Sequence, residues 1–488
     1  MAPLQHPIPP PNVPLTRGER LLHWFDRRTG IRGLLHDALD EPIPGGASWA
    51  YVFGSGLLFL FLSQVISGVF LALYYAPTAD TAHVSVAYIV KVVAAGSFLR
   101  SVHAYGSSAV VIVLLLHLIQ TFTYGAYKGR RELLWLAGAF LFLLMLGMAF
   151  TGYLLPWDQK AYFATTVGTN LLSELPVIGP ALTALLRGGT EMGTLTVSRF
   201  FVIHVFFLPA LIFTFVAIHV YLFRKAGAAG PVHADPVAPK LPAGRFYPRQ
   251  VLMDLAFTFV LIVALGLLAL YRPMELGPVA NPADTTFLPR PEWYYRPIFQ
   301  ELKYFPGPQA VIGIVVIPGV VLGLLFLTPF IDRSHERRPR KRPIAMATFF
   351  LILFGFAALG VDSYWDDSHD PTVAARLQRQ QQQIEQYMHA PFKPYLVGVT
   401  GKTPTTNPLV AKGKSVYESQ SCNGCHGEGG TGTPIAPALT NIGSKYPSDK
   451  LADLLRHPDP GMTAGGMPAY DLPSNEMKAL IAYLESLK

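Results

Sequence analysis

Charged residues are scarce in this chain. Asp, Glu, Lys and Arg make up 14% of its 488 residues, whereas a soluble enzyme of this length would carry about a quarter. Hydrophobic residues make up 51%, and the mean hydropathy is +0.34. This composition excludes an ordinary soluble enzyme and indicates an integral membrane protein. The length also predicts more than one domain.

Cysteine is scarcer still. The chain has two cysteines, Cys422 and Cys425, and both belong to one short motif. A framework of structural disulfides is therefore excluded.

Long hydrophobic runs, in contrast, are abundant. Seven of them are close to the roughly 20 residues that a membrane helix needs. The N-terminus is rich in proline and has no early apolar core, so it does not predict a signal peptide. Residues 17–39 mix arginine with leucine and tryptophan, which predicts an amphipathic helix on the membrane surface, with a solvated leader as the alternative. The seven runs lie at residues 50–75, 102–124, 133–154, 200–223, 251–271, 309–330 and 344–361.

Basic residues are concentrated in alternate loops. The N-terminal segment and the loops at residues 128–131, 224–249 and 333–342 are rich in Lys and Arg, whereas the loops between them are sparser. The positive-inside rule therefore places the basic loops and the N-terminus in the cytoplasm. Seven spans then put the C-terminus outside. The net charge of +8 follows from this asymmetry and does not predict nucleic-acid binding.

The character of the sequence changes after the last hydrophobic run. Residues 366–407 are polar and rich in glutamine, which predicts a linker that is helical in part, between Thr372 and Met388. Residues 408–488 then form a predicted small soluble domain, which contains CNGCH at residues 422–426.

The CNGCH motif predicts a covalent c-type haem. The thiols of Cys422 and Cys425 would add to the haem vinyl groups, and the adjacent His426 would bind the iron. A redox or zinc CxxC motif is the alternative, but the following histidine and the lack of a second cysteine pair disfavour it. Covalent haem attachment occurs outside the cytoplasmic membrane in bacteria, which agrees with the topology. We therefore expect a multi-pass protein of the bacterial inner membrane with this domain on the periplasmic side.

A c-type haem also needs a sixth iron ligand, commonly a thioether. Met467 in GGMPAY is the predicted ligand, and Met462 and His457 are the alternatives. The tail resembles a small class I cytochrome c, through AKGKSVYESQSCNGCHG, APALTNIGSKY and GGMPAY. The resemblance implies that Pro437 lies against His426 and orients it.

Four histidines lie within two of the hydrophobic runs. His103 and His117 are 14 residues apart, and His204 and His219 are 15 apart. At 1.5 Å and 100° per residue, each pair spans roughly 21–22 Å and points to one side of its helix within about 40–60°. Two such helices facing each other would create two bis-histidine sites at two depths, and imidazole is a common haem ligand. The alternative is that each histidine is a lone polar residue that is hydrogen-bonded inside the bundle.

Paired glycines repeat the same spacing. Gly54 and Gly68 are 14 apart in the first run, and so are Gly138 and Gly152 in the third. A glycine removes the side chain where a flat porphyrin would press against a backbone. Pro209 lies between the second pair of histidines and predicts a kink, which would absorb the difference between 14 and 15 residues.

The membrane part of the chain resembles a known family. Its first 226 residues resemble the b-type cytochrome of cytochrome bc complexes, most closely the chloroplast-type bf branch, through FLRSVHAYGSS, GRRELLW, TGYLLPWDQKAYFATTV, LPVIGPALTALLRGG and RFFVIHVFFLPA. Residues 227–365 resemble its subunit IV, through PRPEWYYRPIFQELKYFPG and RRPRKRPIAMATFF. The predicted fold is all-α: a seven-helix membrane bundle, made of a four-helix dihaem core and three further helices, with a soluble helical cytochrome c domain. The expected parts are an N-terminal segment 1–49, the dihaem core 50–226, the subunit IV-like region 227–365, the linker 366–407 and the cytochrome c domain 408–488.

The resemblance implies roles for individual residues. Pro291, Glu292, Trp293 and Tyr294 form the PEWY motif, which lines the quinol-oxidation site in the family, and its glutamate helps to take a proton. The stretch TGYLLPWDQ would form another wall of this site. The ligands of the outer haem b would be His103 with His204, and those of the inner haem b His117 with His219. Two further residues, Arg100 and Arg224, are placed to meet haem propionates on the outer and inner sides, with plain surface arginines as the alternative.

Two absences refine this expectation. The bf-type cytochrome has a cysteine early in its first helix that tethers an extra haem, and this chain has Val52 at that place. A covalent extra haem is therefore not expected. A Rieske iron–sulfur cluster needs two Cys and two His in one soluble domain, so the Rieske protein must be a separate chain.

The predicted function is thus that of a fused cytochrome b/c subunit of a quinol:cytochrome c oxidoreductase. Quinol would be oxidised at an outer site, with electrons divided between a Rieske partner with haem c and the transmembrane haems b, and this division would drive proton translocation. Expected cofactors are two non-covalent haems b and one covalent haem c, with the quinone pool as substrate and a soluble or membrane cytochrome c-type protein as acceptor. A homodimer is expected from the resemblance alone. A non-bifurcating electron conduit and a redox-sensing haem anchor are the alternatives, and the sequence does not name the quinone.

Overall fold

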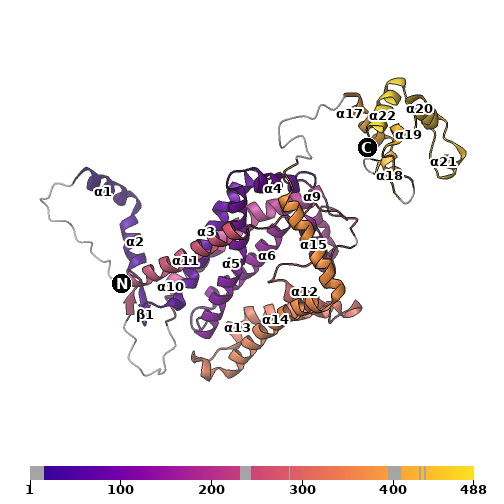
Figure 1. The fold of residues 1–488 in the computed structure, drawn as a ribbon. Coiled ribbons are helices and arrows are strands. Elements are labelled where there is room, and N and C mark those ends of the chain that lie inside the picture. The colour runs from indigo at the N-terminus through magenta and orange to yellow at the C-terminus, as the bar shows by residue number, and fades with distance from the viewer. Residues whose placement is uncertain are drawn as a thin grey trace. The chain divides into compact units, whose positions relative to one another are not determined.

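The computed structural model describes residues 16–230, 243–284, 286–393, 408–427, 430–433 and 436–487. The chain divides into two compact units, Met1–Lys393 and Pro394–Lys488 (Figure 1). Part of the basic loop at 231–242 and part of the predicted linker, residues 394–407, lie outside the described residues. The predicted domain boundaries therefore stay predictions.

Among its described residues, the first unit contains seven helices that are long and apolar enough to cross a membrane, which confirms the predicted count. Five of them are single α-helices with a short 3-10 lead-in at most, and the fourth and sixth spans contain a π-helical turn. A small antiparallel sheet, β1 (Pro42–Pro44) with β2 (Ala243–Arg245), was not expected, because strands of three residues leave no periodic pattern. The spans consist of α3 (Val52–Ala72), α5 (Gly96–Thr123), α6 (Glu132–Leu154), α9 with η2 and α10 (Thr194–Val202, Ile203–Phe207, Leu208–Ala226), α11 (Arg249–Tyr271), η4 with α13 (Ile312–Val316, Ile317–Ile331) and α14 (Pro343–His369).

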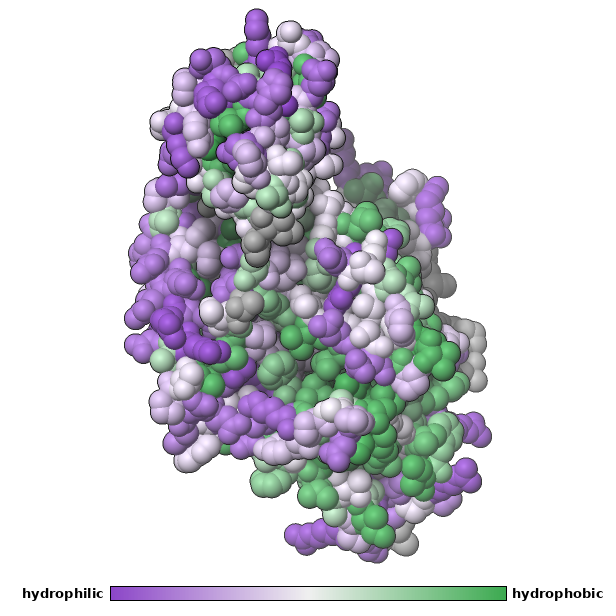
Figure 2. Space-filling model, turned by 90° about the vertical axis from the view of Figure 1, so that its right-hand side faces the viewer, coloured by the Kyte–Doolittle hydropathy of each residue, from purple (hydrophilic) through white to green (hydrophobic). Residues whose placement is uncertain are grey.

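The spans pack in a definite order. α3 lies against α5, α10 lies against α6, and α11 contacts both α3 and α5. The core shared by α3, α5 and α11 contains Leu60, Val110, Val113 and Leu265. Hydrophobic side chains also gather on the outside of the bundle, as Figure 2 shows on one face. Large apolar residues such as those along α11 and α14 stay exposed in the isolated chain, which is what a lipid-facing surface requires.

Short helices cover the ends of the bundle. At the end formed by residues 272–306, called the outer end below, lie α4 (Ala82–Lys91), α7 (Gln159–Ser173), α8 (Gly179–Arg187) and α12 (Arg296–Leu302). The predicted amphipathic segment forms α1 (Arg17–Thr29) and α2 (Ile31–Leu39), which are separated by Gly30 at φ 64°. Its location on a membrane surface stays a prediction.

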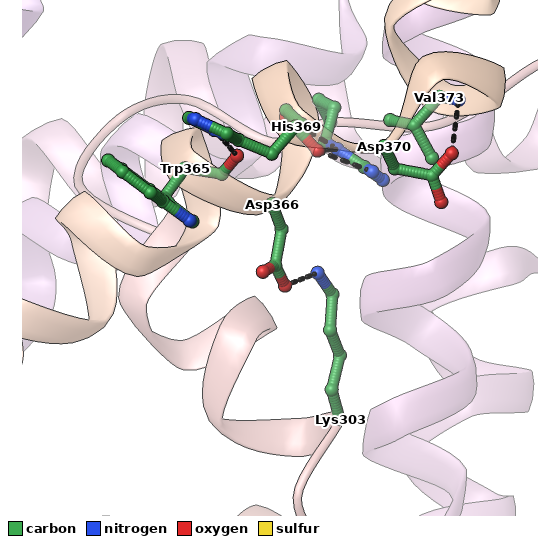
Figure 3. A pocket seen from close by; sticks show the side chains of 8 residues that line it. Lys303, Trp365, Asp366, His369, Asp370 and Val373 are labelled. Atoms are coloured by element: carbon green, nitrogen blue, oxygen red, sulfur yellow. Dashed lines mark hydrogen bonds and ion pairs between the residues drawn. The ribbon is translucent and has the colours of Figure 1, made fainter.

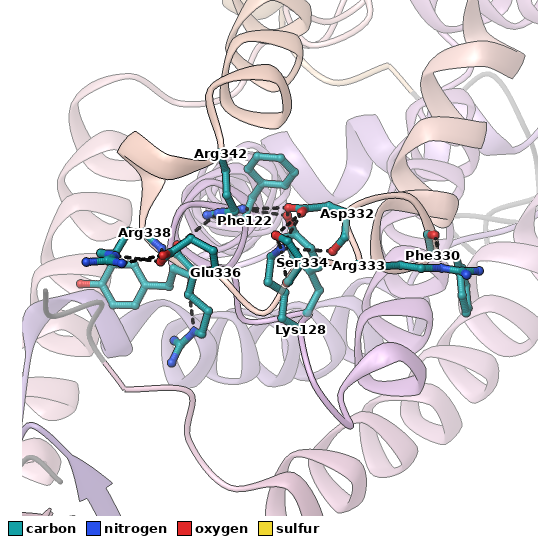
Figure 4. A network of polar contacts seen from close by, with 12 residues as sticks. Phe122, Lys128, Phe330, Asp332, Arg333, Ser334, Glu336, Arg338 and Arg342 are labelled. Atoms are coloured by element: carbon teal, nitrogen blue, oxygen red, sulfur yellow. Dashed lines mark hydrogen bonds and ion pairs between the residues drawn. The ribbon is translucent and has the colours of Figure 1, made fainter. Parts of the chain in front are cut away.

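The opposite, inner end is held by a network of charged side chains (Figure 4). Asp332, after α13, accepts hydrogen bonds from Tyr127 Oη at 2.6 Å and Lys128 Nζ at 2.5 Å. Arg342, whose side chain is 1% exposed, lies 3.4 Å from the same carboxylate and donates to the carbonyl of Phe122. Buried charges persist only when they are paired. The network therefore ties the loop after α5 to the loop between α13 and α14.

Part of the predicted linker is a docked helix. α15 (Pro371–His389) begins at Asp370, whose side chain caps it. At its other end, Lys91 Nζ donates to the carbonyl of Tyr387 at 2.5 Å, and the sulfur of Met388 accepts from the backbone N–H of Leu276 at 3.3 Å. A lysine at the carboxyl end of a helix satisfies carbonyls that have no partner within the helix. α15 therefore belongs to the first unit.

The second unit is helical, as predicted. Its core lies between α17 (Pro408–Ser419) and α22 (Ser474–Ser486), where Tyr417, Met477 and Leu480 are at most 2% exposed. A Cβ at Gly413 would lie 1.9 Å from the carbonyl oxygen of Ala479, so the two helices touch through this glycine. The other helices in the part of this unit that the structure describes are α18 (Cys422–His426), α19 (Ile442–Lys445), α20 (Ser448–Arg456) and α21 (Pro460–Ala464).

Candidate haem and quinol sites

The first pair of membrane histidines meets in the bundle. His103 on α5 and His204 on η2 have ring centroids 6.3 Å apart, and their planes are inclined by 78°. Two metal–nitrogen bonds of about 2 Å on opposite sides of one ion would separate the ligating nitrogens by about 4 Å and the ring centres by about 6 Å. The spacing of these two rings therefore fits a shared iron.

The other ring nitrogen of each of these histidines is already held. Nδ1 of His204 donates to the carbonyl of Met148 at 3.1 Å, and Thr151 Oγ1 lies 3.2 Å away. Nδ1 of His103 shares a hydrogen bond of 2.9 Å with Ser67 Oγ. A hydrogen bond at one ring nitrogen fixes the orientation and leaves Nε2 to bind a metal. Ser67, Met148 and Thr151 were not identified from the sequence, because no local pattern marks them.

The paired glycines face the histidines. A Cβ added at any of the four glycines would meet the Cε1 atom of one histidine, with no other side chain as near. A porphyrin edge needs such a side-chain-free surface beside its ligand. The distances are 3.7 Å for Gly54 with His117, 3.1 Å for Gly68 with His103, 3.1 Å for Gly138 with His219, and 2.5 Å for Gly152 with His204.

The second pair of histidines sits deeper in the bundle. Nδ1 of His117 is buried and has no hydrogen-bond partner among the described residues. A buried polar nitrogen without a partner costs free energy unless a ligand or water supplies one. The facing glycines Gly54 and Gly138, and not this ring nitrogen, are the features that fit a haem at this depth. The haem-ligand assignments of all four histidines stay predictions.

A π-helical turn absorbs the difference between the two histidine spacings. In η2, the backbone N–H of Leu208 donates to the carbonyl of Ile203, five residues earlier. Such a turn inserts one extra residue into an α-helix. The 15 residues from His204 to His219 therefore span nearly the same rotation as the 14 from His103 to His117. The sequence predicted that a kink at Pro209 would absorb this difference. The π-helical turn ends two residues before Pro209, and proline has no backbone N–H to donate a helical hydrogen bond.

The PEWY loop lies at the outer end between α11 and α12. Glu292 Oε1 accepts a hydrogen bond from Lys160 Nζ at 2.9 Å, and the two side chains are 31% and 43% exposed. Tyr294 is 5% exposed, and burial, followed by the nearby charge of Glu292, raises the pKa of its hydroxyl. Trp293 Nε1 donates to Ser108 Oγ at 3.4 Å, while Pro291 is half-buried.

The end of α6 and the start of α7 border this loop, as the resemblance implied for TGYLLPWDQ. Tyr153 Oη lies 3.5 Å from the carbonyl of Arg290, and Lys160 Nζ lies 5.4 Å from the centre of the Tyr153 ring. The sequence analysis missed Lys160. The signal that would have pointed to it is a lysine beside a wall motif in a chain where charge is scarce.

The two arginines that were expected to meet propionates have protein partners. Arg100 donates to the carbonyls of Met274 and Glu275, at 2.8 and 3.0 Å. Arg224 pairs with Glu41 at 3.3 Å. Both arginines support loop segments, and their contact with a haem stays a prediction.

The CNGCH motif forms α18 in the second unit. Cys422 and Cys425 do not form a disulfide, and burial raises the pKa of the Cys422 thiol. His426 Nδ1 lies 2.9 Å from the carbonyl of Pro437, as the resemblance implied. This contact turns Nε2 of the same ring toward a ligand.

The candidates for the sixth ligand differ in position. Met467 packs against the same core as Cys422. Met462 is on α21 and is not part of that cluster, and His457 has a side chain that is 77% exposed and pairs with Asp453. The location of Met467 supports it over the two alternatives.

Three family models match the chain. Cytochrome b/b6/petB covers residues 38–227, the carboxyl-terminal cytochrome b/b6/petD family covers residues 279–377, and cytochrome c covers residues 410–488. Their order along the chain is the order in which the sequence motifs occur.

Individual proteins that are similar to this chain are also cytochrome b proteins. The chain is 34% identical over 345 residues to cytochrome b/c1 of Bradyrhizobium diazoefficiens, covering 70% of this chain and 50% of that protein. It is 31% identical over 366 residues to cytochrome b of Rhodobacter capsulatus, covering 69% of this chain and 82% of that one. Over 221 residues it is 41% identical to the menaquinol:cytochrome c reductase cytochrome b subunit of Geobacillus thermodenitrificans, covering 44% and 99%.

A solved structure described as a hyperthermophilic respiratory complex III is also similar. It matches with a TM-score of 0.63 and 27% identity, over 75% of this chain and 96% of that one. The chain belongs to the cytochrome b family, as a bc-complex cytochrome b subunit whose two cytochrome b regions are fused to a carboxyl-terminal cytochrome c domain.

Proposed function

We propose that this chain oxidises quinol at its PEWY loop, as the cytochrome b/c subunit of a bc-type quinol:cytochrome c reductase in a bacterial inner membrane. The pairing of His103 with His204 beside their facing glycines is the observation that carries the proposal. It belongs to the same unit as the loop that presents Glu292. The names of the Geobacillus relative and of the similar complex III structure support the same reaction.

Glu292 is the proposed proton acceptor. A hydroquinone that loses two electrons must also lose two protons, and a positioned carboxylate is a suitable base. Lys160 holds the carboxylate at 2.9 Å, so the substrate hydroxyl must compete with an ammonium group for the same oxygen. Tyr294, buried and with its hydroxyl pKa raised, stays neutral and shapes the pocket.

The membrane histidines are the proposed ligands of two haems b, one at each depth, and CNGCH with Met467 is the proposed site of haem c. Bound haem supplies one-electron transfer at its iron. His103 and His204 hold the outer site because α5 begins and η2 lies toward the outer end, whereas His117 and His219 hold the inner site. The two depths allow electrons from quinol to be divided between the membrane path and the outer side, coupled to outward proton release.

The partners follow from what the chain lacks. A separate Rieske iron–sulfur protein takes the first electron, because the two cysteines of this chain belong to CNGCH. A cytochrome c-type protein is the proposed acceptor, and a homodimer the proposed assembly. With Val52 at the place of the tethering cysteine, no covalent extra haem is expected.

The test uses the purified complex, with a short-chain quinol as donor and soluble cytochrome c as acceptor. Glu292→Gln should slow turnover by about 100- to 10,000-fold while the haem b spectra stay intact, because a positioned general base contributes about that much. Loss of haem b absorbance in this variant would assign Glu292 a structural role instead.

Inhibitors separate the alternatives. With bifurcation, a stigmatellin-type outer-site inhibitor stops quinol-dependent reduction of cytochrome c, and a Rieske signal co-purifies. A non-bifurcating conduit or a redox-sensing anchor would show no Rieske signal and no response to outer-site inhibitors, and either result would overturn the proposal.

A further inference from the structure

The PEWY loop is anchored on both sides to one carboxylate. Asp367 on α14 accepts hydrogen bonds from Arg290 at 2.9 Å (Nε) and 2.7 Å (Nη2), and from Arg296 Nη1 at 2.8 Å. All three side chains are at most 13% exposed. Arg290 directly precedes the motif and Arg296 follows two residues after it, so a five-residue segment is closed by a single side chain.

The contacts with Asp367 fix the orientation of the two arginine side chains as well as their distance from the carboxylate. Arg290 presents two nitrogens to the same carboxylate, and such a paired contact fixes the planes of both groups. Arg296 is held on its other face as well, with its guanidinium carbon 4.0 Å from the centre of the Tyr364 ring. The backbone N–H of Arg296 also donates to the carbonyl of Glu292, at 3.1 Å. The same contacts that hold the two arginines therefore hold the backbone that presents Glu292.

Neighbouring carboxylates of α14 make separate contacts that do not involve Arg290 or Arg296. Asp366 pairs with Lys303 at 3.0 Å (Figure 3). Gln300, which is 1% exposed, donates to both Asp362 and Asp366 at 2.8 Å. These contacts are more exposed than the one at Asp367: the side chain of Asp366 is 46% exposed, against 8% for Asp367.

We propose that Asp367 is a positioning residue for quinol oxidation, which acts through Arg290 and Arg296 to hold Glu292 at the site. This inference rests on the function proposed for the PEWY loop. Stability alone does not require an ion triad here, because well-packed apolar residues often stabilise a protein as well as a buried ion pair does. A misplacement of about 1 Å at a reacting group can cost about a hundredfold in rate. The role of the triad of Asp367, Arg290 and Arg296 is therefore to orient the PEWY loop.

The experiment compares three variants of the purified complex. Asp367→Asn keeps the shape but removes the charge, Asp367→Glu keeps the charge, and Asp366→Asn is the matched control one residue away. Turnover is measured over a range of decylubiquinol and of a short-chain menaquinol, with soluble cytochrome c as acceptor. The haem b and haem c absorbances are recorded for each variant.

We expect Asp367→Asn to lower kcat by about 10- to 100-fold with a smaller change in KM, since the binding pocket remains while the base is misplaced. Asp367→Glu should recover most of the loss, and Asp366→Asn should stay within about twofold of the wild type. All three should keep wild-type haem content.

Three results would overturn the proposal. Unchanged kcat in Asp367→Asn would show that the loop needs no such anchor. Loss of haem b from both Asp367 variants would show that the carboxylate stabilises the bundle. A wild-type complex that oxidises neither quinol would remove the proposed function itself, whereas an active wild type with an equally active Asp367→Asn removes the anchor alone.

Discussion

Replacement of Gly152 by alanine tests whether the glycines that face the four membrane histidines form a haem cradle, that is, a surface without side chains for the porphyrin edge. The added Cβ would lie 2.5 Å from Cε1, 3.0 Å from Nε2 and 3.1 Å from Nδ1 of His204. Real Cβ contacts are not that short, so the imidazole must move. It is not free to do so, because its Nδ1 is bonded to the carbonyl of Met148 and lies near Thr151.

The other three glycines give a graded series. The Cβ distance is 3.1 Å at Gly68 and Gly138, and an ordinary 3.7 Å at Gly54. Overpacking of a dense interior costs about 1–3 kcal/mol, which corresponds to about 5- to 150-fold in binding. We expect the upper part of that range for Gly152→Ala, the lower part at Gly68 and Gly138, and little change at Gly54.

The assay is haem b content per chain, together with a redox titration that separates the two haems b. Gly147→Ala is the matched control on α6, because its Cβ would meet only Leu208, at 4.0 Å. Gly152→Ala should lose or shift the outer haem selectively. If Gly152→Ala and Gly147→Ala kept the same haem content and potentials, the glycines would not form a cradle and the reasoning would be refuted.

Three further variants probe the other sites. Replacing Lys160 with Gln should free Glu292 and weaken the dependence of quinol turnover on ionic strength, which steady-state rates at low and high salt would reveal; an unchanged salt response would contradict this. Met467→Ala should keep the covalent haem on a denaturing gel but abolish the low-spin spectrum of haem c, and an unaltered spectrum would point to another ligand. Burial raises the pKa of Asp332, but hydrogen bonds, chiefly from Lys128, outweigh it and lower that pKa below its usual range. Its stabilisation is therefore complete above about pH 4 and is lost as the pH falls further, so the midpoint of thermal unfolding should depend less on acid pH in Asp332→Asn than in the wild type.

Features that repeat at fixed spacing could be predicted from the sequence. Hydropathy located the seven spans because each needs about 20 apolar residues in a row. The interval between His103 and His117 predicted two depths because an α-helix converts residue number into distance and rotation. CNGCH predicted its chemistry because the reacting atoms lie within one turn.

Contacts between distant segments could not be predicted in this way. Lys160 and Glu292 are 132 residues apart, and Arg290 and Asp367 are 77 apart. No periodicity links such pairs, since their encounter depends on how α7, the PEWY loop and α14 pack. The helix between Thr372 and Met388 was predicted and is α15, but its docking was not: the polar, glutamine-rich sequence is typical of a linker, and the contacts of Tyr387 and Met388 with the first unit leave no pattern in it.

Because charged residues are scarce in this chain, each buried ion pair between distant segments needs a physical reason. In a chain with 14% charged residues, a charged side chain that is at most 13% exposed must have a partner or destabilise the fold. Arg290 and Arg296 flank the one loop that presents a carboxylate to the proposed substrate, and both turn to Asp367 rather than to Glu292. Had either arginine paired with Glu292, the base would be neutralised by a buried and permanently charged group. Asp367 thus occupies both arginines, and Glu292 is left with a lysine that is 43% exposed, a partner that solvent can replace when a proton is to be taken.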